Sequence, residues 1–278
     1  MTSLPTFTAT RYLQPLREGG SLPAIVDTDC GGLFVVKFRG AGQGAKALVA
    51  ELIVGMLAGE LDLPTPDLAL VQVPPPFGRG EPDPEIQDLL KASHGINVGL
   101  RYLDGAFNFA PAAAGHLLRP EFASHVVWLD AFVTNPDRTH RNPNLLIWER
   151  RPWLIDHGAA LYAHHDWSRV DAARIRTPFP IIRDHVLLAE SDDLEAADAE
   201  MAGRLTGEVL AGVLDEVPDA LLTDTVGGTE FACADEARKR YLSYLQDRLR
   251  PPRAFVAEAM RARELLLREP PRPRTARR

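Results

Sequence analysis

Three polar residues near the middle of the chain have the types and the order that phosphoryl transfer needs. Asp137 and Asn142 lie five positions apart in Asn-Pro-Asp-Arg-Thr-His-Arg-Asn, and Asp156 follows in Trp-Leu-Ile-Asp-His-Gly. A carboxylate can orient an attacking hydroxyl as a general base, and an amide together with a second carboxylate can hold Mg²⁺ on phosphates. We therefore predict a catalytic site of Asp137, Asn142 and Asp156, in which the last two ligate the metal.

These residues need a helix, a loop and a hairpin to position them. Apolar residues at mostly helical spacing predict a helix from Glu121 to Thr134, which Asn135-Pro136 stops. Two short apolar runs around a polar turn, Leu145 to Trp148 and Trp153 to Asp156, predict a β-hairpin with Asp156 at the end of its second strand. The alternative interpretation is an ordinary packed hairpin at the surface, because Asn-Pro and Asp-Arg pairs often mark simple turns.

Lys37 lies upstream in an apolar β run, Gly31 to Phe38, of a chain with only four lysines. A buried ammonium is costly unless it meets an anion. The following segment, Ala45 to Leu61, has helical periodicity and carries Glu51, so we predict a Lys37–Glu51 ion pair that fixes nucleotide phosphates. The alternatives are a snorkelling edge-strand lysine, Glu60 at the helix end in place of Glu51, and a Glu51 that faces water near Lys46.

Glycine clusters lie on both sides of Lys37 in the sequence. Gly19, Gly20 and Ser21 separate the predicted strands Arg11 to Leu16 and Leu22 to Val26, where backbone N–H groups could cover a phosphate. Two glycines between strands also make ordinary hairpins, so that alternative stays open. A second glycine cluster, 40–46, lacks the P-loop spacing and is interpreted as a connector that could bind an anion at the helix start.

The rest of the chain supplies the remaining elements. Residues 74–84 predict an irregular loop, followed by a short helix over 85–92, and strands are expected at Leu68 to Val73 and Ile96 to Leu103. The chain should cross between two parts near this last strand, so Tyr102 and Leu103 are candidate contacts of the adenine. Helices are predicted over 196–214, 234–249 and 254–267.

Arg138 or Arg141 could steady the transferring phosphoryl group, or either could be structural.

The ordered set Lys37, Glu51, Asp137, Asn142 and Asp156 resembles that of HipA-like kinases, a branch of the protein kinase superfamily. The resemblance implies an α+β, bilobed protein-kinase-like fold, with a small β-rich N-lobe (1–103) and a mostly helical C-lobe (104–267). It also implies ATP and Mg²⁺ as cofactors and transfer to a Ser or Thr hydroxyl of a protein. In that scheme Lys37 contacts phosphates, Glu51 anchors it and Asp137 is the base.

The chain departs from the usual kinase motifs. Asn135-Pro136-Asp137 stands where His-Arg-Asp is usual, and Asp156-His157-Gly158 replaces Asp-Phe-Gly. The acceptor class therefore stays open among a protein serine, a lipid or sugar hydroxyl and a small metabolite. Ser21 is a regulatory candidate by analogy with related phosphate loops, although an ordinary turn serine is the favoured interpretation.

Composition favours a globular chain. Its 278 residues are 45% hydrophobic and 25% charged, with a net charge of −7, which argues against general nucleic-acid binding. No membrane partner is expected, and with no apolar span and no signal-peptide pattern at the start, the expected location is cytoplasmic. Cys30 and Cys233 predict no disulfide framework. Residues 268–278 are basic and proline-rich and predict a disordered tail.

Two other functions remain open at this point. A nucleotide-binding scaffold of the pseudokinase kind would keep the same residues without turnover. A metal-dependent phosphohydrolase could draw on several histidines and a carboxylate, because imidazole and carboxylate ligands suit transition metals. The candidates for that cluster are His140, His157, His164, His165 and Asp166.

Overall fold

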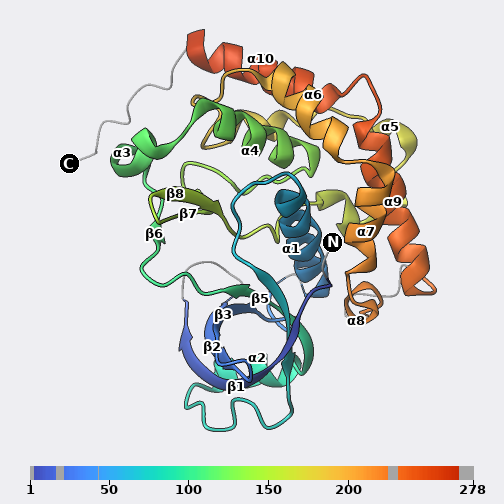
Figure 1. Ribbon diagram of the computed structural model, residues 1–278. Helices are drawn as coiled ribbons and strands as arrows, with labels where there is room; N and C mark the ends of the chain where they lie inside the picture. Colours follow the sequence, from blue (N-terminus) through green and yellow to red (C-terminus); the bar gives the residue numbers. More distant parts are fainter. Residues whose placement is uncertain (1–2, 17–21, 43, 225–230, 269–278) are drawn as a thin grey trace.

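The computed structural model describes residues 3–16, 22–42, 44–224 and 231–268. It shows a mixed α+β fold, with a sheet in the N-terminal part and helices in the C-terminal part, so the predicted α+β class is confirmed (Figure 1). The predicted phosphate loop of Gly19, Gly20 and Ser21 lies outside the described residues. The same holds for the predicted tail beyond residue 268.

The N-terminal sheet is a closed barrel of five strands. They are β1 (Thr6–Pro15), β2 (Ala24–Thr28), β3 (Leu33–Lys37), β4 (Leu68–Val73) and β5 (Gly95–Arg101), in the order β1-β2-β3-β5-β4. Neighbours are antiparallel except β1 and β4, where Thr6 to Thr8 pair in parallel with Leu70 to Gln72. Alternate residues of β4 point inward, as the period of a half-buried strand requires.

The barrel has its own apolar interior. Val26, Phe34, Val36 and Val71 are buried there, and the helix α2 (Pro84–Ala92) adds Ile86 and Leu90 to the same core. In Figure 1 this helix lies against the barrel. The individual strands and α2 agree with the sequence prediction to within a few residues, and residues 74–83 form turns, as expected of the loop.

Helix α1 (Ala45–Glu60) lies between the barrel and the C-terminal helices (Figure 1). It contacts β4 and β5 on the barrel side, and α7 (Gly207–Asp215) and α8 (Asp219–Leu222) on the other. Because neighbours cover it on both sides, most of its residues are buried, including Leu52, Ile53 and Leu57. The predicted helix over 45–61 is confirmed.

A second, smaller sheet follows the barrel in the chain. It consists of β6 (Phe107–Asn108), β7 (Leu145–Trp148) and β8 (Arg151–Leu154). The predicted hairpin is therefore present, and its turn residues Glu149 and Arg150 both have positive φ, as a two-residue turn of type I′ requires. Asp156 does not end the second strand as predicted, because β8 stops at Leu154 and Asp156 lies in the loop beyond it.

The helical part is built on α4 (Pro120–Phe132), whose Trp128 and Phe132 rings pack against Phe255. Around it lie α6 (Leu194–Arg204) and α10 (Ala254–Arg268), which both contact α4, and α9 (Ala234–Leu249), which contacts α7 and α8. Short helices complete the described part: α3 (Pro111–Ala114), α5 (Ala172–Ile175) and the 3₁₀ turns η1 (Gly115–Leu117), η2 (Tyr162–His165), η3 (Trp167–Arg169) and η4 (Pro180–Asp184).

The sequence prediction of one helix over residues 196–214 is wrong. The structure has two helices there, α6 and α7, separated by Leu205 and Thr206. The Thr206 hydroxyl accepts a hydrogen bond from the Val209 N–H at 3.2 Å, and this side-chain cap starts a new helix. Apolar periodicity continued across the break and concealed it. The predictions for α9 and α10 are confirmed.

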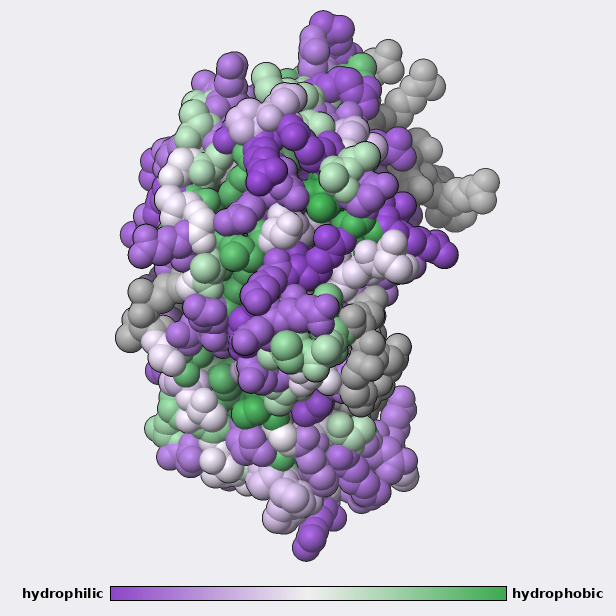
Figure 2. All heavy atoms as spheres, turned by 90° about the vertical axis from the view of Figure 1, so that its right-hand side faces the viewer, coloured by the Kyte–Doolittle hydropathy of each residue, from purple (hydrophilic) through white to green (hydrophobic). Residues whose placement is uncertain are grey.

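The surface that carries α7, α8 and α9 is mostly hydrophilic. Figure 2 shows this face, on which hydrophobic side chains occur in small groups between charged and polar ones. Among the described residues, no helix is both long enough and apolar enough to cross a bilayer.

Candidate active site

The ammonium of Lys37 joins two carboxylates that come from distant parts of the chain. Its Nζ lies 2.7 Å from Glu51 Oε2 and 2.5 Å from Asp156 Oδ1. Lys37 is the last residue of β3, Glu51 lies in the second turn of α1, and Asp156 follows β8. The structure thus brings together the barrel, α1 and the smaller sheet at a single cation.

Burial and charge oppose each other at these three groups. Burial alone would lower the pKa of Lys37, but the carboxylates of Glu51 and Asp156 outweigh it and raise that pKa. Burial raises the pKa of the Asp156 carboxyl too, but Lys37 outweighs burial there and lowers it. For Glu51, whose side chain is 0% exposed, burial prevails over Lys37 and the pKa is raised. Lys37 is therefore a firmly charged cation at the edge of the buried region.

Glu51 has a second partner, which removes the alternatives considered for it. Its Oε2 also accepts the backbone N–H of His157 at 2.6 Å, so the carboxylate links α1 to the residue after Asp156. It does not face water, and Lys46 is engaged elsewhere, because its Nζ donates to the His164 carbonyl at 2.6 Å. Lys37 is not a snorkelling edge residue either, since β3 has neighbours on both sides.

Asp137 is held by two asparagine amides. Asn142 Nδ2 donates to Asp137 Oδ2 at 2.8 Å, and Asn144 Nδ2 donates to the same oxygen at 3.1 Å. Burial raises the pKa of the Asp137 carboxyl, and these amides oppose the rise only in part. The nearby Asp156 charge adds to the increase. A half-buried carboxylate with a raised pKa has the character expected of a general base.

Asn144 is the site residue that sequence reasoning missed. It precedes β7 in a left-handed conformation with φ 48°, which asparagine tolerates better than most residues. Sequence reasoning assigned the Asn142-Pro143-Asn144 segment to a loop and attached chemistry only to its first residue. The second asparagine of Asn-Pro-Asn, directly ahead of a strand, was the available signal.

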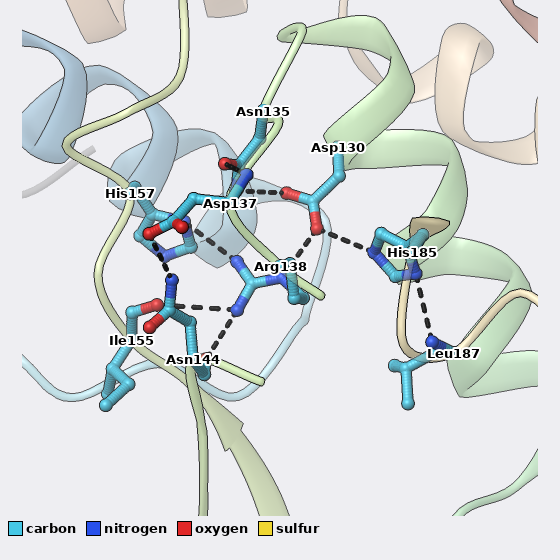
Figure 3. Close-up of polar contacts among 9 residues, drawn as sticks. All are labelled: Asp130, Asn135, Asp137, Arg138, Asn144, Ile155, His157, His185 and Leu187. Carbon is cyan, nitrogen blue, oxygen red and sulfur yellow. Dashed lines mark hydrogen bonds and ion pairs between the residues drawn. The ribbon is translucent and has the colours of Figure 1, made fainter. Parts of the chain in front are cut away.

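The Arg138 side chain points into the interior of the protein and not to the surface at Asp137. Its side chain is 0% exposed, and its Nε donates to Asp130 Oδ2 at 2.5 Å in the interior (Figure 3). The hypothesis that Arg138 steadies the transferring phosphoryl group is therefore wrong, and the structural alternative holds for it. Arg141 is exposed in the same loop.

Tyr102 and Leu103 follow β5, where the chain leaves the barrel. The Tyr102 N–H donates to the Leu33 carbonyl at 2.9 Å, and the Leu103 carbonyl accepts from Ala106 at 3.1 Å. These two backbone groups are thus engaged within the protein, which leaves the Leu103 N–H and the Tyr102 carbonyl, to judge from the described residues, as candidates for contacts with a base. The predicted adenine contact stays a prediction confined to those groups.

Oxygen donors at Asn142 and Asp156 suit Mg²⁺. The Asp156 side chain is 40% exposed, and Asn142 is exposed with its amide nitrogen directed to Asp137, which leaves its carbonyl oxygen for a cation. Hard oxygen ligands with open positions for water are what Mg²⁺ prefers. These residues therefore fit the metal that phosphoryl transfer uses.

The histidines do not form a transition-metal centre. Among the described residues, no group of three or more His, Cys, Asp or Glu side chains is arranged to hold a metal ion. His157 Nδ1 lies 3.3 Å from an Arg138 nitrogen, and His164 Nδ1 lies 3.0 Å from the Tyr241 hydroxyl. Burial lowers the pKa of His157 to about 3, so its ring is neutral. The phosphohydrolase alternative gains no support from this geometry.

The site thus combines a lysine–glutamate pair, a carboxylate that accepts from two asparagines, and a second carboxylate after a hairpin. Residues 10–175, more than half of the chain, match the family model described as HipA-like kinase, so the chain belongs to the HipA-like kinase family. No curated protein matches the chain in sequence.

A solved structure has the same overall fold. The proinflammatory kinase CtkA from Helicobacter pylori aligns with 95% of this chain and 99% of its own, with a TM-score of 0.58 at 13% sequence identity. At this identity the likeness concerns the fold alone. Family and fold together support a phosphotransferase.

Proposed function

We propose that this protein is an ATP- and Mg²⁺-dependent kinase that phosphorylates a Ser or Thr hydroxyl of another protein. The proposal includes a bilobed arrangement, in which residues 1–103 form the N-lobe and 104–267 the C-lobe. The observation that carries it is the position of Lys37 Nζ, 2.7 Å from Glu51 and 2.5 Å from Asp156. A fixed lysine beside a half-exposed carboxylate is what binding of a nucleotide triphosphate between two lobes requires.

Each residue then has a separate task. Lys37 binds phosphate oxygens while Glu51 keeps its ammonium in place, and Asn142 and Asp156 hold Mg²⁺. When bound, Mg²⁺ neutralises negative charge that develops on the phosphates. Asp137 accepts the proton of the acceptor hydroxyl, whose oxygen forms a bond to the γ-phosphorus as the bond to the leaving ADP oxygen breaks. Positioning and electrostatic stabilisation supply most of the rate.

The amides around Asp137 support its role as the base. Asn142 and Asn144 both donate to Oδ2, so they fix the carboxylate and leave Oδ1 for an acceptor hydroxyl. The raised pKa of Asp137 makes the carboxylate a better proton acceptor than an ordinary aspartate. A protein acceptor is proposed on the strength of the kinase family, and Ser21 lies in a proposed phosphate loop.

The first test combines nucleotide binding with phosphoryl transfer. We expect ATP to raise the melting temperature of the wild type only with Mg²⁺, and radiolabel from γ-labelled ATP to appear on the protein or on an added acceptor protein. Asp156→Ala should lose the Mg²⁺-dependent part of the shift and the labelling. The matched control is Asp166→Ala, which removes an exposed carboxylate paired with Arg169 outside the site.

Three results would separate the alternatives. The kinase proposal is supported if Asp156→Ala loses both the Mg²⁺-dependent shift in melting temperature and the labelling, while Asp166→Ala keeps both. A Mg²⁺-dependent shift without labelling of any tested acceptor favours a nucleotide-binding scaffold. No response of the wild type to ATP, with or without Mg²⁺, contradicts the proposed function.

A further inference from the structure

Arg138 and Asp130 form a buried ion pair beneath the proposed catalytic loop. Both side chains are 0% exposed, and Arg138 Nε lies 2.5 Å from Asp130 Oδ2. Burial would raise the pKa of the Asp130 carboxyl, but Arg138 and His185 together outweigh burial and hold that pKa well below its usual value. Taking two charges out of water is costly unless further hydrogen bonds satisfy both groups. The partners of this pair are therefore informative.

The other nitrogens of Arg138 reach two further segments. One terminal nitrogen donates to the Asn144 carbonyl in a short hydrogen bond and to the Ile155 carbonyl at 3.4 Å. The second lies 3.3 Å from His157 Nδ1. Figure 3 shows these contacts spreading from a single guanidinium. Arg138 thus joins the loop that carries Asp137 to the loop that carries Asp156.

Asp130 is anchored from a third segment. Its Oδ2 also accepts from His185 Nε2 at 2.9 Å, and its Oδ1 accepts from Asn135 Nδ2 at 2.9 Å. His185 Nδ1 accepts the Leu187 N–H at 3.1 Å, so the ring proton is on Nε2 and a neutral imidazole donates to Asp130. Three donors, two from the loop after α4 and one from the segment after η4, therefore converge on one carboxylate of α4.

The contacts of this network end next to both proposed functional carboxylates. Asn135, held by Asp130, accepts the backbone N–H of Asp137 at 3.1 Å. Asn144, held through its carbonyl by Arg138, donates to the Asp137 side chain. Ile155 and His157, the other two contacts of Arg138, are the immediate neighbours of Asp156 in the chain.

We propose that Arg138, anchored by Asp130 and His185, is the positioning residue that sets the Asp137 and Asp156 carboxylates relative to each other. This inference rests on the proposed function, in which those two carboxylates act on one phosphoryl group. Arg138 touches no reacting atom and acts through its neighbours. The two loops have no other shared cation in the part of the chain that the structure describes, because Lys37 contacts Asp156 from the side of the barrel.

The variant that tests this role is Arg138→Lys. Lysine keeps the positive charge, but its single nitrogen cannot hold Asp130 and the two carbonyls in the fixed fork of a guanidinium. A misplacement of a catalytic group by about 1 Å costs roughly 100-fold in rate. We expect turnover at saturating ATP and Mg²⁺ to fall about 100-fold, while the KM for ATP changes less than about threefold.

Arg248→Lys is the matched control. Arg248 is also buried and donates to the carbonyls of Phe132, Ala131 and Ile175 at 2.6 to 2.8 Å, but it contacts no residue of the two loops. We expect it to lower the melting temperature about as much as Arg138→Lys and to keep turnover within about threefold of the wild type. If Arg138 had only a structural role, Arg138→Lys and Arg248→Lys would lose turnover to the same extent. That result would overturn the proposal.

Amide hydrogen exchange gives a readout that does not depend on activity. In Arg138→Lys, exchange should become faster in residues 135–144 and 155–157 and at Val186, whose N–H donates to the Arg138 carbonyl at 3.0 Å. In Arg138→Lys, exchange in the barrel should not change. In Arg248→Lys, exchange in residues 135–144 and 155–157 and at Val186 should stay as in the wild type. If the wild type neither binds ATP nor labels, the proposed function fails while exchange still decides whether Arg138 orders both loops. Unchanged exchange overturns the inference.

A second variant covers the case in which Arg138→Lys does not fold. His185→Phe removes one donor to Asp130 with a ring of similar size and keeps Arg138. We expect turnover to fall about tenfold, less than for Arg138→Lys, because the anchor is loosened and not lost. Turnover equal to that of the wild type would overturn the anchoring role of His185 and, with it, the proposal as stated.

Discussion

Replacement of Lys37 by methionine should destabilise the protein through the charge that it leaves behind. Glu51 is 0% exposed, and Lys37 is its cationic partner at 2.7 Å. Removing one member of a buried ion pair costs about 3–5 kcal/mol, because the other stays buried and unpaired. For a chain of this size, about 4 kcal/mol corresponds to a melting temperature lower by about 10 °C.

The double variant Lys37→Met/Glu51→Gln tests whether the unpaired charge of Glu51 causes the loss of stability in Lys37→Met. Glutamine has nearly the shape of glutamate, still accepts the His157 N–H and carries no charge, so most of the lost stability should return. Thermal unfolding of the wild type, both single variants and the double variant gives the coupling between the two positions. A double variant no more stable than Lys37→Met would refute the buried-charge reasoning, as would a Lys37→Met melting temperature within about 2 °C of the wild type.

The stability of Lys37→Met should also depend on pH differently from that of the wild type. Burial already raises the pKa of Glu51, and loss of Lys37 removes the charge that opposes this rise. A carboxyl whose folded pKa lies above its unfolded value contributes stability below the unfolded pKa, and that stability is lost as pH rises through the folded pKa. The stability deficit of Lys37→Met should therefore be smallest near pH 4 and grow towards pH 8. A deficit independent of pH would contradict this assignment.

Two further predictions concern Asp137 and Asp130. Burial raises the pKa of Asp137, and a base must be unprotonated, so transfer should increase with pH through an apparent pKa above the ordinary aspartate value of about 3.9, measured by label transfer across pH. Asp137→Asn should abolish transfer while ATP still shifts the melting temperature, and retained transfer would exclude Asp137 as the base. Asp130→Asn should cost about 3 kcal/mol at pH 7, because a buried pair is broken. The folded pKa of Asp130 is depressed, so the contribution of its carboxylate to stability is present above about pH 4 and is lost as pH falls through the folded pKa. The melting temperatures of Asp130→Asn and the wild type should therefore converge in acid. A difference in melting temperature that does not change with pH would show that charge is not the cause.

Local patterns in the sequence predicted most elements, because each depends on residues close in the chain. The hairpin of β7 and β8, the helix α1 and the strand that ends in Lys37 all have periodicity or turn residues of their own. The Lys37–Glu51 contact was predicted as well, since a lysine in an apolar strand needs a nearby anion.

What could not be predicted depends on contacts between distant residues. Closure of the barrel rests on the parallel pairing of β1 with β4, which no local pattern marks. The contact of Asp130 with His185 spans 55 positions, and neither residue stands in a motif. The sequence left the role of Arg138 open, because its position next to Asp137 indicates nothing about the direction of its side chain. The break before α7 was missed because the Thr206 cap interrupts an otherwise continuous apolar pattern.

The burial of α1 on both sides limits how the protein could be switched. Because Glu51 is part of this helix, moving it away from Lys37 by rotation would expose Leu52, Ile53 and Leu57, which the barrel and the C-terminal helices now cover. Exposure of three such side chains costs about 6 kcal/mol. An effector would need a preference of that size for the rotated state. Rotation of α1 that breaks the lysine–glutamate contact is therefore costly, and we expect control of activity to act on access of the acceptor or on nucleotide supply.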